Sequence, residues 1–168
     1  MKSRSYVKFI FAIILGFYFV RCVYLDSAWH FIDNVNLIFH EAGHPVFSIF
    51  GSFIGALGGS IMQIFIPLIL VIYFMNRKQP YSATIVSMWL AQSIVNVSVY
   101  MSDAIKMRLP LLGGDSSIHD WNYIFSTIHV LSMSEGIAYI TKCVGLIILF
   151  FSIIMAISYS LHESRKEI

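Results

Sequence analysis

Charged residues and cysteines are scarce in this chain, and each scarcity excludes a class of protein. Asp, Glu, Lys and Arg make up 12% of the 168 residues, hydrophobic residues make up 58%, and the mean hydropathy is +0.77. This composition lies far outside the range of soluble domains and favours an integral membrane protein in contact with the lipid bilayer. A net charge of +2 is too small to indicate a nucleic-acid partner. Both cysteines, Cys22 and Cys143, lie in or beside apolar segments, so we interpret them as membrane-packed thiols without a disulfide.

A cleavage site is also absent after the first apolar segment. Residues 1–8 are basic and residues 9–20 are apolar, as in a secretory signal. The residues that follow are Arg-Cys-Val-Tyr, and they do not offer the small side chains that signal peptidase needs. We therefore expect an uncleaved first membrane helix. The sequence shows no internal repeat and no low-complexity segment, so residues 1–168 are expected to form a single domain.

Apolar segments separated by short polar stretches predict the fold class, an all-α polytopic integral membrane protein. About four to five membrane helices are expected, with the apolar segments at about residues 7–24, 31–50, 61–75, 82–103 and 136–161. Four glycines between residues 51 and 59 predict a Gly-rich re-entrant segment with close backbone approaches. Residues 104–134 form the longest polar loop. The charge distribution between loops does not decide the membrane orientation.

The segment His40-Glu41-Ala42-Gly43-His44 carries the clearest chemistry in the sequence. On a helix, two imidazoles four residues apart lie on one face and are spaced to bind a single Zn²⁺ ion. Glu41 can then reach a water in the open coordination position and act as a general base. Ionisable groups are costly in an apolar environment, and the residues on both sides of this segment are apolar. The motif therefore predicts a zinc site with Glu41 as the catalytic residue.

A catalytic zinc usually has three protein ligands, so another side chain is required. Gln92, Asn96 and Asp103 fall within about 40° of one another on a helix. Asp103 is favoured as the third ligand because it is charged. Gln92 and Asn96 have two open interpretations, contacts to substrate or hydrogen bonds between helices.

His119 and Asp120, in the polar loop, are the alternative third ligands. The loop would bring both to the same side of the membrane as Asp103. Asp120 has two further interpretations, a helix cap and a carboxylate that orients a zinc-bound imidazole.

The sequence HEAGH in an apolar helix, followed by glycines, another apolar segment and a helix with Asn96 before Asp103, resembles the site-2-protease class of intramembrane zinc metalloproteases. The resemblance covers about residues 31–108, the predicted core. It implies zinc bound by His40 and His44 with Glu41 as base, Asp103 as third ligand, and Asn96 as a contact for substrate backbone. Residues 102–104 read Ser-Asp-Ala where that class has Leu-Asp-Gly, so Asp120 stays open as the ligand.

These patterns favour an intramembrane zinc metalloprotease, a multi-pass protein of the cell membrane that hydrolyses peptide bonds in membrane proteins or peptides. One alternative keeps the zinc and changes the substrate to a lipid-linked or small amide or ester. Another is a non-catalytic membrane interaction protein or metal carrier. Glu41 argues against a purely structural zinc, because structural sites normally fill all four positions with His and Cys.

Overall fold

The computed structural model describes residues 2–25, 29–110, 112 and 119–165. These residues are helical and contain no strand. The predicted polar loop lies partly outside them, since residues 111 and 113–118 are not described. The α-helices are α1 (Lys2–Val20), α2 (Phe31–Phe47), α3 (Ser52–Asn76), α4 (Pro80–Ser102), α5 (Asp120–Thr127) and α6 (Ser134–Arg165). A π-helical stretch, Arg21–Leu25, extends α1, and single 3₁₀ turns at Ser48–Phe50 and Leu131–Met133 precede α3 and α6.

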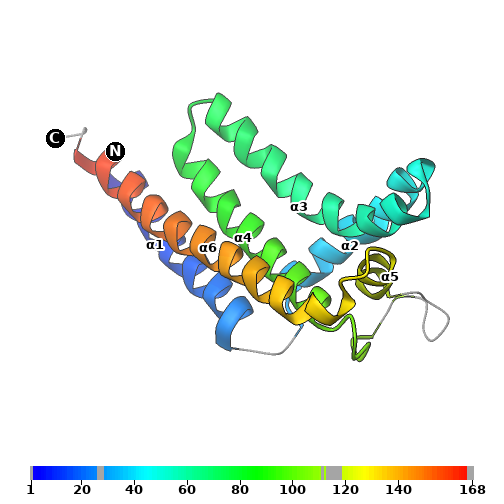
Figure 1. Cartoon of the computed structure of the whole chain (residues 1–168). Coiled ribbons are helices and arrows are strands. Elements are labelled where there is room, and N and C mark those ends of the chain that lie inside the picture. Colours follow the sequence, from blue (N-terminus) through cyan, green and yellow to red (C-terminus); the bar gives the residue numbers. More distant parts are fainter. Residues whose placement is uncertain (1, 26–28, 111, 113–118, 166–168) are drawn as a thin grey trace.

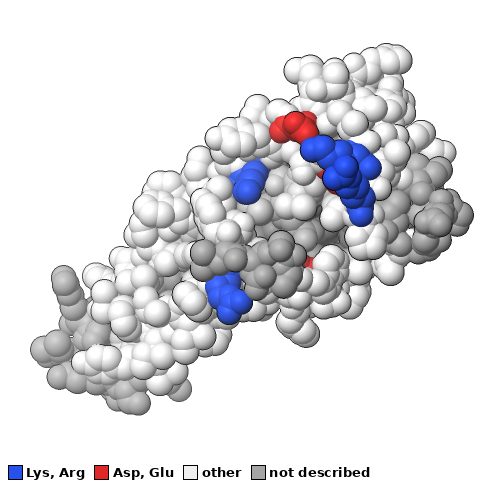
Figure 2. All heavy atoms as spheres, turned by 90° about the horizontal axis from the view of Figure 1, so that it is seen from below, with Lys and Arg blue, Asp and Glu red and all other residues white. Residues whose placement is uncertain are grey.

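Four helical segments are long and apolar enough to cross a membrane, in agreement with the prediction of a membrane protein. They are Ser5–Tyr24, Ser52–Asn76, Pro80–Ser102 and Leu131–His162. The HExxH helix α2 is shorter and is not among them. Few charged side chains appear on the face of the molecule drawn in Figure 2, as expected for a surface that contacts lipid.

Helix α4 lies at the centre of the bundle and packs along α6 and α3, while α1 packs on α6. It is also the most buried of the four long segments. A Cβ atom built on Gly145 of α6 would lie 2.6 Å from Val95 Cγ2 and 2.9 Å from the Ala91 carbonyl oxygen of α4. Because glycine has no side chain, these two helices approach closely, as small residues permit in membranes.

The break after the HExxH helix occurs at Gly51, which has φ +99°. Residues with a side chain rarely adopt this conformation, so glycine is required there. The Gly-rich re-entrant segment expected from the sequence is not seen, because Gly55, Gly58 and Gly59 lie inside the continuous helix α3. Their spacing of three and four residues places them on one face of that helix, which packs against α2.

Close backbone approach is the physical reason for this glycine face. A Cβ on Gly43 of α2 would lie 2.2 Å from the Gly58 carbonyl oxygen, and one on Gly58 would lie 2.5 Å from Phe47 Cβ. The sequence prediction of close approaches is therefore correct, while the irregular backbone is not. Figure 1 shows the result: α2 and α5 lie at one end of the bundle, and the chain termini lie toward the other.

Candidate metal centre

Helix α2 is fixed on α4 by buried polar side chains rather than by apolar packing alone. Gln92 Nε2 and Asn96 Nδ2 donate to Asp33 Oδ1 at 2.8 and 3.0 Å. Asn36 Nδ2 donates to Gln92 Oε1 at 2.7 Å. Asn96 Oδ1 accepts from Gln63 Nε2 of α3 at 2.8 Å. Such buried hydrogen bonds are costly to break in an apolar environment, so they set the position of α2 relative to its neighbours.

Gln92 and Asn96 were predicted as substrate contacts, with hydrogen bonding between helices as the open alternative. In the structure the amide groups of both side chains bind α2, and that of Asn96 also binds α3. The structure thus places them in the role that the alternative describes. A substrate contact for either residue stays a prediction.

The two imidazoles of the HExxH motif lie side by side on α2, with ring centroids 5.0 Å apart. His40 is buried, 7% exposed, and His44 is half-buried. His44 Nδ1 is 2.9 Å from the Gly55 carbonyl oxygen. Since a carbonyl only accepts, we assign the hydrogen to Nδ1, which leaves Nε2 as a ligand atom. A hydrogen bond of this kind also fixes the orientation of a metal-binding imidazole.

Asp120 is the carboxylate that joins these imidazoles. Its Oδ2 lies 3.1 Å from His40 Nε2 and 3.4 Å from His44 Nε2. His40, His44 and Asp120 each offer one possible ligand atom, and these three atoms all lie within 4.8 Å of one another. Ligand atoms bound 2.0–2.1 Å from a tetrahedral zinc lie about 3.3 Å apart. The two contacts to Asp120 are close to that spacing, so the group could hold a metal ion.

Helix α5 carries Asp120 and is docked by the residues that follow it. Trp121 Nε1 donates to Ser60 Oγ of α3 at 3.1 Å, and Asn122 Nδ2 donates to the Ala104 carbonyl oxygen at 2.8 Å. Trp121 is also buried in an apolar cluster with residues of α4 and α6. The carboxylate is therefore presented by a short helix held on two neighbouring elements.

Asp103, the favoured ligand in the sequence analysis, lies elsewhere. Its Oδ2 atom accepts the backbone N–H groups of Arg108 and Leu109, each at 2.9 Å. His119 Nε2 is 3.5 Å from Asp103 Oδ2. Among the described residues, the structure brings together His40, His44 and Asp120, and Asp103 is not part of that group.

His119, the other alternative ligand, supports α5. Its Nδ1 accepts the Asn122 backbone N–H at 3.3 Å, so His119 caps the helix that Asp120 begins. Its ring packs on Tyr100 with centroids 4.3 Å apart. Burial lowers the pKa of His119 and favours the neutral imidazole. Asp103 and His119 thus lie next to each other between the end of α4 and the start of α5, without a hydrogen bond at His119 Nε2.

Tyr100 is a site residue that the sequence analysis missed. Its hydroxyl donates to Asp120 Oδ2 at 3.3 Å and accepts the Asp120 backbone N–H at 3.1 Å. Its ring lies 5.7 Å from that of His40. The signal was available, because Tyr100 lies four residues after Asn96 and three before Asp103 and so shares their helix face.

The charges of the site follow from these contacts. Burial raises the pKa of Asp120, but the hydrogen bonds from His40 and His44 outweigh it and lower that pKa to about 2. The hydrogen bond to Asp120 is the main cause that raises the pKa of His44 to about 9. The negative charge of Glu41, the residue after His40, adds to this rise. Asp120 is thus negative at neutral pH, as a metal ligand must be, while the proton that His44 Nε2 shares with it would be released when a metal ion binds.

Gly59 leaves the space beside both imidazoles open. A Cβ atom built there would lie 2.7 Å from His40 Nε2 and 2.8 Å from His44 Nε2. A side chain at this position would therefore fill the volume next to the two ligand atoms. The glycine face of α3 serves the site as well as the helix packing.

Comparisons with models of protein families, with curated proteins and with solved structures found no match. The resemblance over residues 31–108 stays a prediction, and the geometry of the site is the basis for assigning a function.

Replacing Tyr100 with phenylalanine should weaken metal binding by about 10–100-fold, the effect typical of losing a group that orients a metal ligand. The ring and its packing on His119 are kept, while both hydrogen bonds to Asp120 are lost. Competition with a chromogenic zinc chelator measures the change. Tyr139→Phe is the control, since Tyr139 is exposed on α6. Unchanged affinity in Tyr100→Phe would show that the hydroxyl does not position Asp120.

Proposed function

We propose that the protein is a zinc-dependent hydrolase of the membrane, with His40, His44 and Asp120 as the metal ligands and Glu41 as the general base. The observation that carries the proposal is the group of three ligand atoms within 4.8 Å of one another, formed by two imidazoles and one carboxylate. Two nitrogens and one oxygen suit zinc, and three protein ligands leave a fourth position for water, as in catalytic sites.

A zinc ion held by His40, His44 and Asp120 would supply a water with a pKa of about 7 and would polarise the carbonyl group of the substrate. The chain supplies the rest. Glu41 is exposed and directly follows a ligand, so it can take a proton from water and pass it to the leaving amine. Burial of His40 and packing of Trp121 exclude bulk water from one side of the site. The half-buried His44 and the exposed Glu41 leave the other side accessible to substrate.

Peptide bonds of membrane-associated proteins are the substrate class that we propose, which makes the protein an intramembrane metalloprotease of site-2-protease type. The site lies on helices packed against long apolar ones, so substrates that reach it from the membrane are favoured. We further propose that the four long segments all cross the cell membrane. Hydrolysis of a lipid-linked or small amide or ester uses the same residues and is separated from proteolysis by the choice of substrate.

Glu41→Gln should retain zinc and lose hydrolysis by at least about 100-fold, because the amide cannot accept the proton from water. Purified protein in lipid nanodiscs is incubated with a library of fluorogenic transmembrane peptides and with fluorogenic lipid esters, and bound zinc is measured by mass spectrometry. Glu135→Gln is the matched control, since Glu135 is exposed and pairs with Lys106.

Cleavage of peptides by wild type and Glu135→Gln, with none by Glu41→Gln, supports the protease. Cleavage of the esters alone supports the alternative substrate. A zinc-loaded wild type that cleaves neither class contradicts the enzyme proposal and favours a metal carrier.

A further inference from the structure

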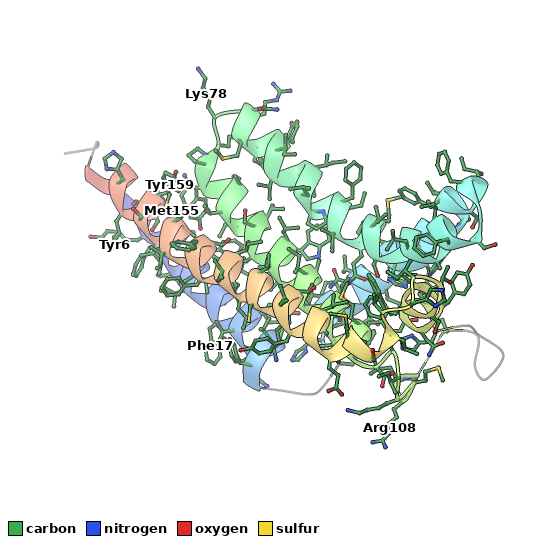
Figure 3. All side chains as sticks on the ribbon, viewed as in Figure 1. Tyr6, Phe17, Lys78, Arg108, Met155 and Tyr159 are labelled. Atoms are coloured by element: carbon green, nitrogen blue, oxygen red, sulfur yellow. The ribbon has the colours of Figure 1, made fainter. Side chains whose placement is uncertain are left out.

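A second site lies at the opposite end of the bundle from the metal centre, and it is independent of the proposed hydrolase activity. A pocket of about 470 Å³ forms where the start of α1, the α3–α4 connection and the end of α6 meet. Figure 3 shows Lys78 and Tyr159 at this end, and Arg108 at the other. The described lining includes the basic side chains of Lys8 and Lys78, the hydroxyls of Ser82 and Tyr159, and His162.

The pocket lies where the membrane surface is expected. Four segments are long enough to cross a membrane. At this end of the bundle two of them begin, at Ser5 and Pro80, and the other two end, at Asn76 and His162. All four boundaries are within four residues of a pocket-lining residue. A cavity at the common end of these segments lies at the level of the lipid headgroups.

Lys8 is held in place at the pocket. The Tyr81 hydroxyl donates to the Lys8 carbonyl oxygen at 2.6 Å, and Lys8 Nζ lies 5.3 Å from the centre of the Tyr81 ring. Helix α4 begins beside these groups at Pro80, so its positive dipole end adds to the charge of the two lysines.

Lys78 occupies a backbone position that favours glycine. It has φ +55° and follows α3. Its N–H donates to the Met75 carbonyl oxygen, and the Gln79 N–H donates to the Phe74 carbonyl oxygen. These two hydrogen bonds form the helix-ending motif in which glycine is the usual residue. A lysine here is conformationally less favourable than glycine.

We propose that this pocket binds the phosphate group of an anionic membrane lipid, with Lys78 and Lys8 as its cationic partners. Ammonium groups, hydroxyls and a helix N-terminus are the groups that bind phosphate in proteins. The headgroup depth of the pocket identifies a lipid as the source of that phosphate. Binding there anchors the end of α3 to the starts of α1 and α4.

Lys78→Gly is the decisive variant, because it removes the cation and also relieves the unfavourable backbone conformation. The protein in neutral detergent micelles is titrated with short-chain phosphatidylglycerol or phosphatidylcholine, and bound lipid is counted by native mass spectrometry. Wild type should prefer phosphatidylglycerol, and Lys78→Gly should lose about tenfold or more of that affinity. Its thermal unfolding midpoint should be at least that of wild type.

Arg77→Ala is the matched control. Arg77 is adjacent in sequence, but its guanidinium lies over the Tyr73 ring, 5.5 Å from the centre, and it does not line the pocket. Loss of one basic residue near an anionic surface lowers the affinity for anionic lipid by about fivefold. Arg77→Ala should therefore lower the affinity for phosphatidylglycerol by no more than that. Equal losses in both variants, or none in Lys78→Gly, would overturn the proposal. Displacement of phosphatidylglycerol by millimolar inorganic phosphate would overturn the assignment to a lipid.

Discussion

Replacing Asp120 with alanine should reduce bound zinc from about one ion per chain to nearly none, with an affinity loss greater than about 100-fold. Loss of a side chain that only orients a metal ligand already lowers metal affinity by about 10–100-fold, so loss of the ligand itself should lower it further. Asp120 Oδ2 lies 3.1 Å from His40 Nε2 and 3.4 Å from His44 Nε2. Metal analysis by mass spectrometry after dialysis against a weak chelator measures the stoichiometry.

Asp103→Asn is the control for Asp120→Ala, because it removes one negative charge from the competing position. Its amide oxygen can still accept a backbone N–H from the segment that Asp103 holds. This variant should keep at least half of the bound zinc. The reverse pattern, with zinc lost in Asp103→Asn and kept in Asp120→Ala, would show that Asp103 is the ligand.

A single methyl group at Gly59 should also remove the metal. In Gly59→Ala the new Cβ would lie 2.7 and 2.8 Å from the Nε2 atoms of His40 and His44, closer than non-bonded atoms approach. The imidazole rings must move away, and their separation from Asp120 then changes. We expect zinc affinity to fall by about 100-fold or more, measured by chelator competition.

Gly136→Ala provides the control, since a Cβ on Gly136 has no neighbour within 4 Å. It lies in the helix α6, where alanine is favoured over glycine, so its stability should equal or exceed that of wild type. Wild-type zinc affinity in Gly59→Ala would mean that the metal does not lie beside α3 and that the proposed geometry is wrong.

Local sequence patterns were sufficient to predict the long helices and two of the three proposed metal ligands, His40 and His44. Apolar segments gave all four long helices within about ten residues at each end, and the motif spacing placed His40 and His44 on one face of α2. Both results depend on periodicities of one helix, which the sequence shows directly.

The glycines and the third carboxylate depend on contacts between distant segments. Gly55, Gly58 and Gly59 suggested a broken backbone, yet packing against α2 keeps them in a helix. Asp103 and Asp120 both follow apolar helices at the same end of the bundle, so the pattern alone did not distinguish them. The difference comes from Trp121 and Asn122, which dock α5 on α3 and on the end of α4.

The polar face of α4 shows the same limit. Gln92 and Asn96 were correctly recognised as unusual in an apolar helix, but their partner, Asp33, lies on α2. A buried amide bonded to a neighbouring helix and one that faces a substrate have the same sequence pattern. Only the relative position of the two helices separates these roles.

The central claim is that two imidazoles and one carboxylate bind a single zinc ion. X-ray absorption at the zinc edge of the purified wild-type protein tests it most directly. We predict one zinc per chain with four nitrogen or oxygen neighbours at about 2.0–2.1 Å, and the outer-shell scattering of two imidazoles. Protein that holds no zinc after supplementation, or a spectrum without imidazole scattering, would contradict the account.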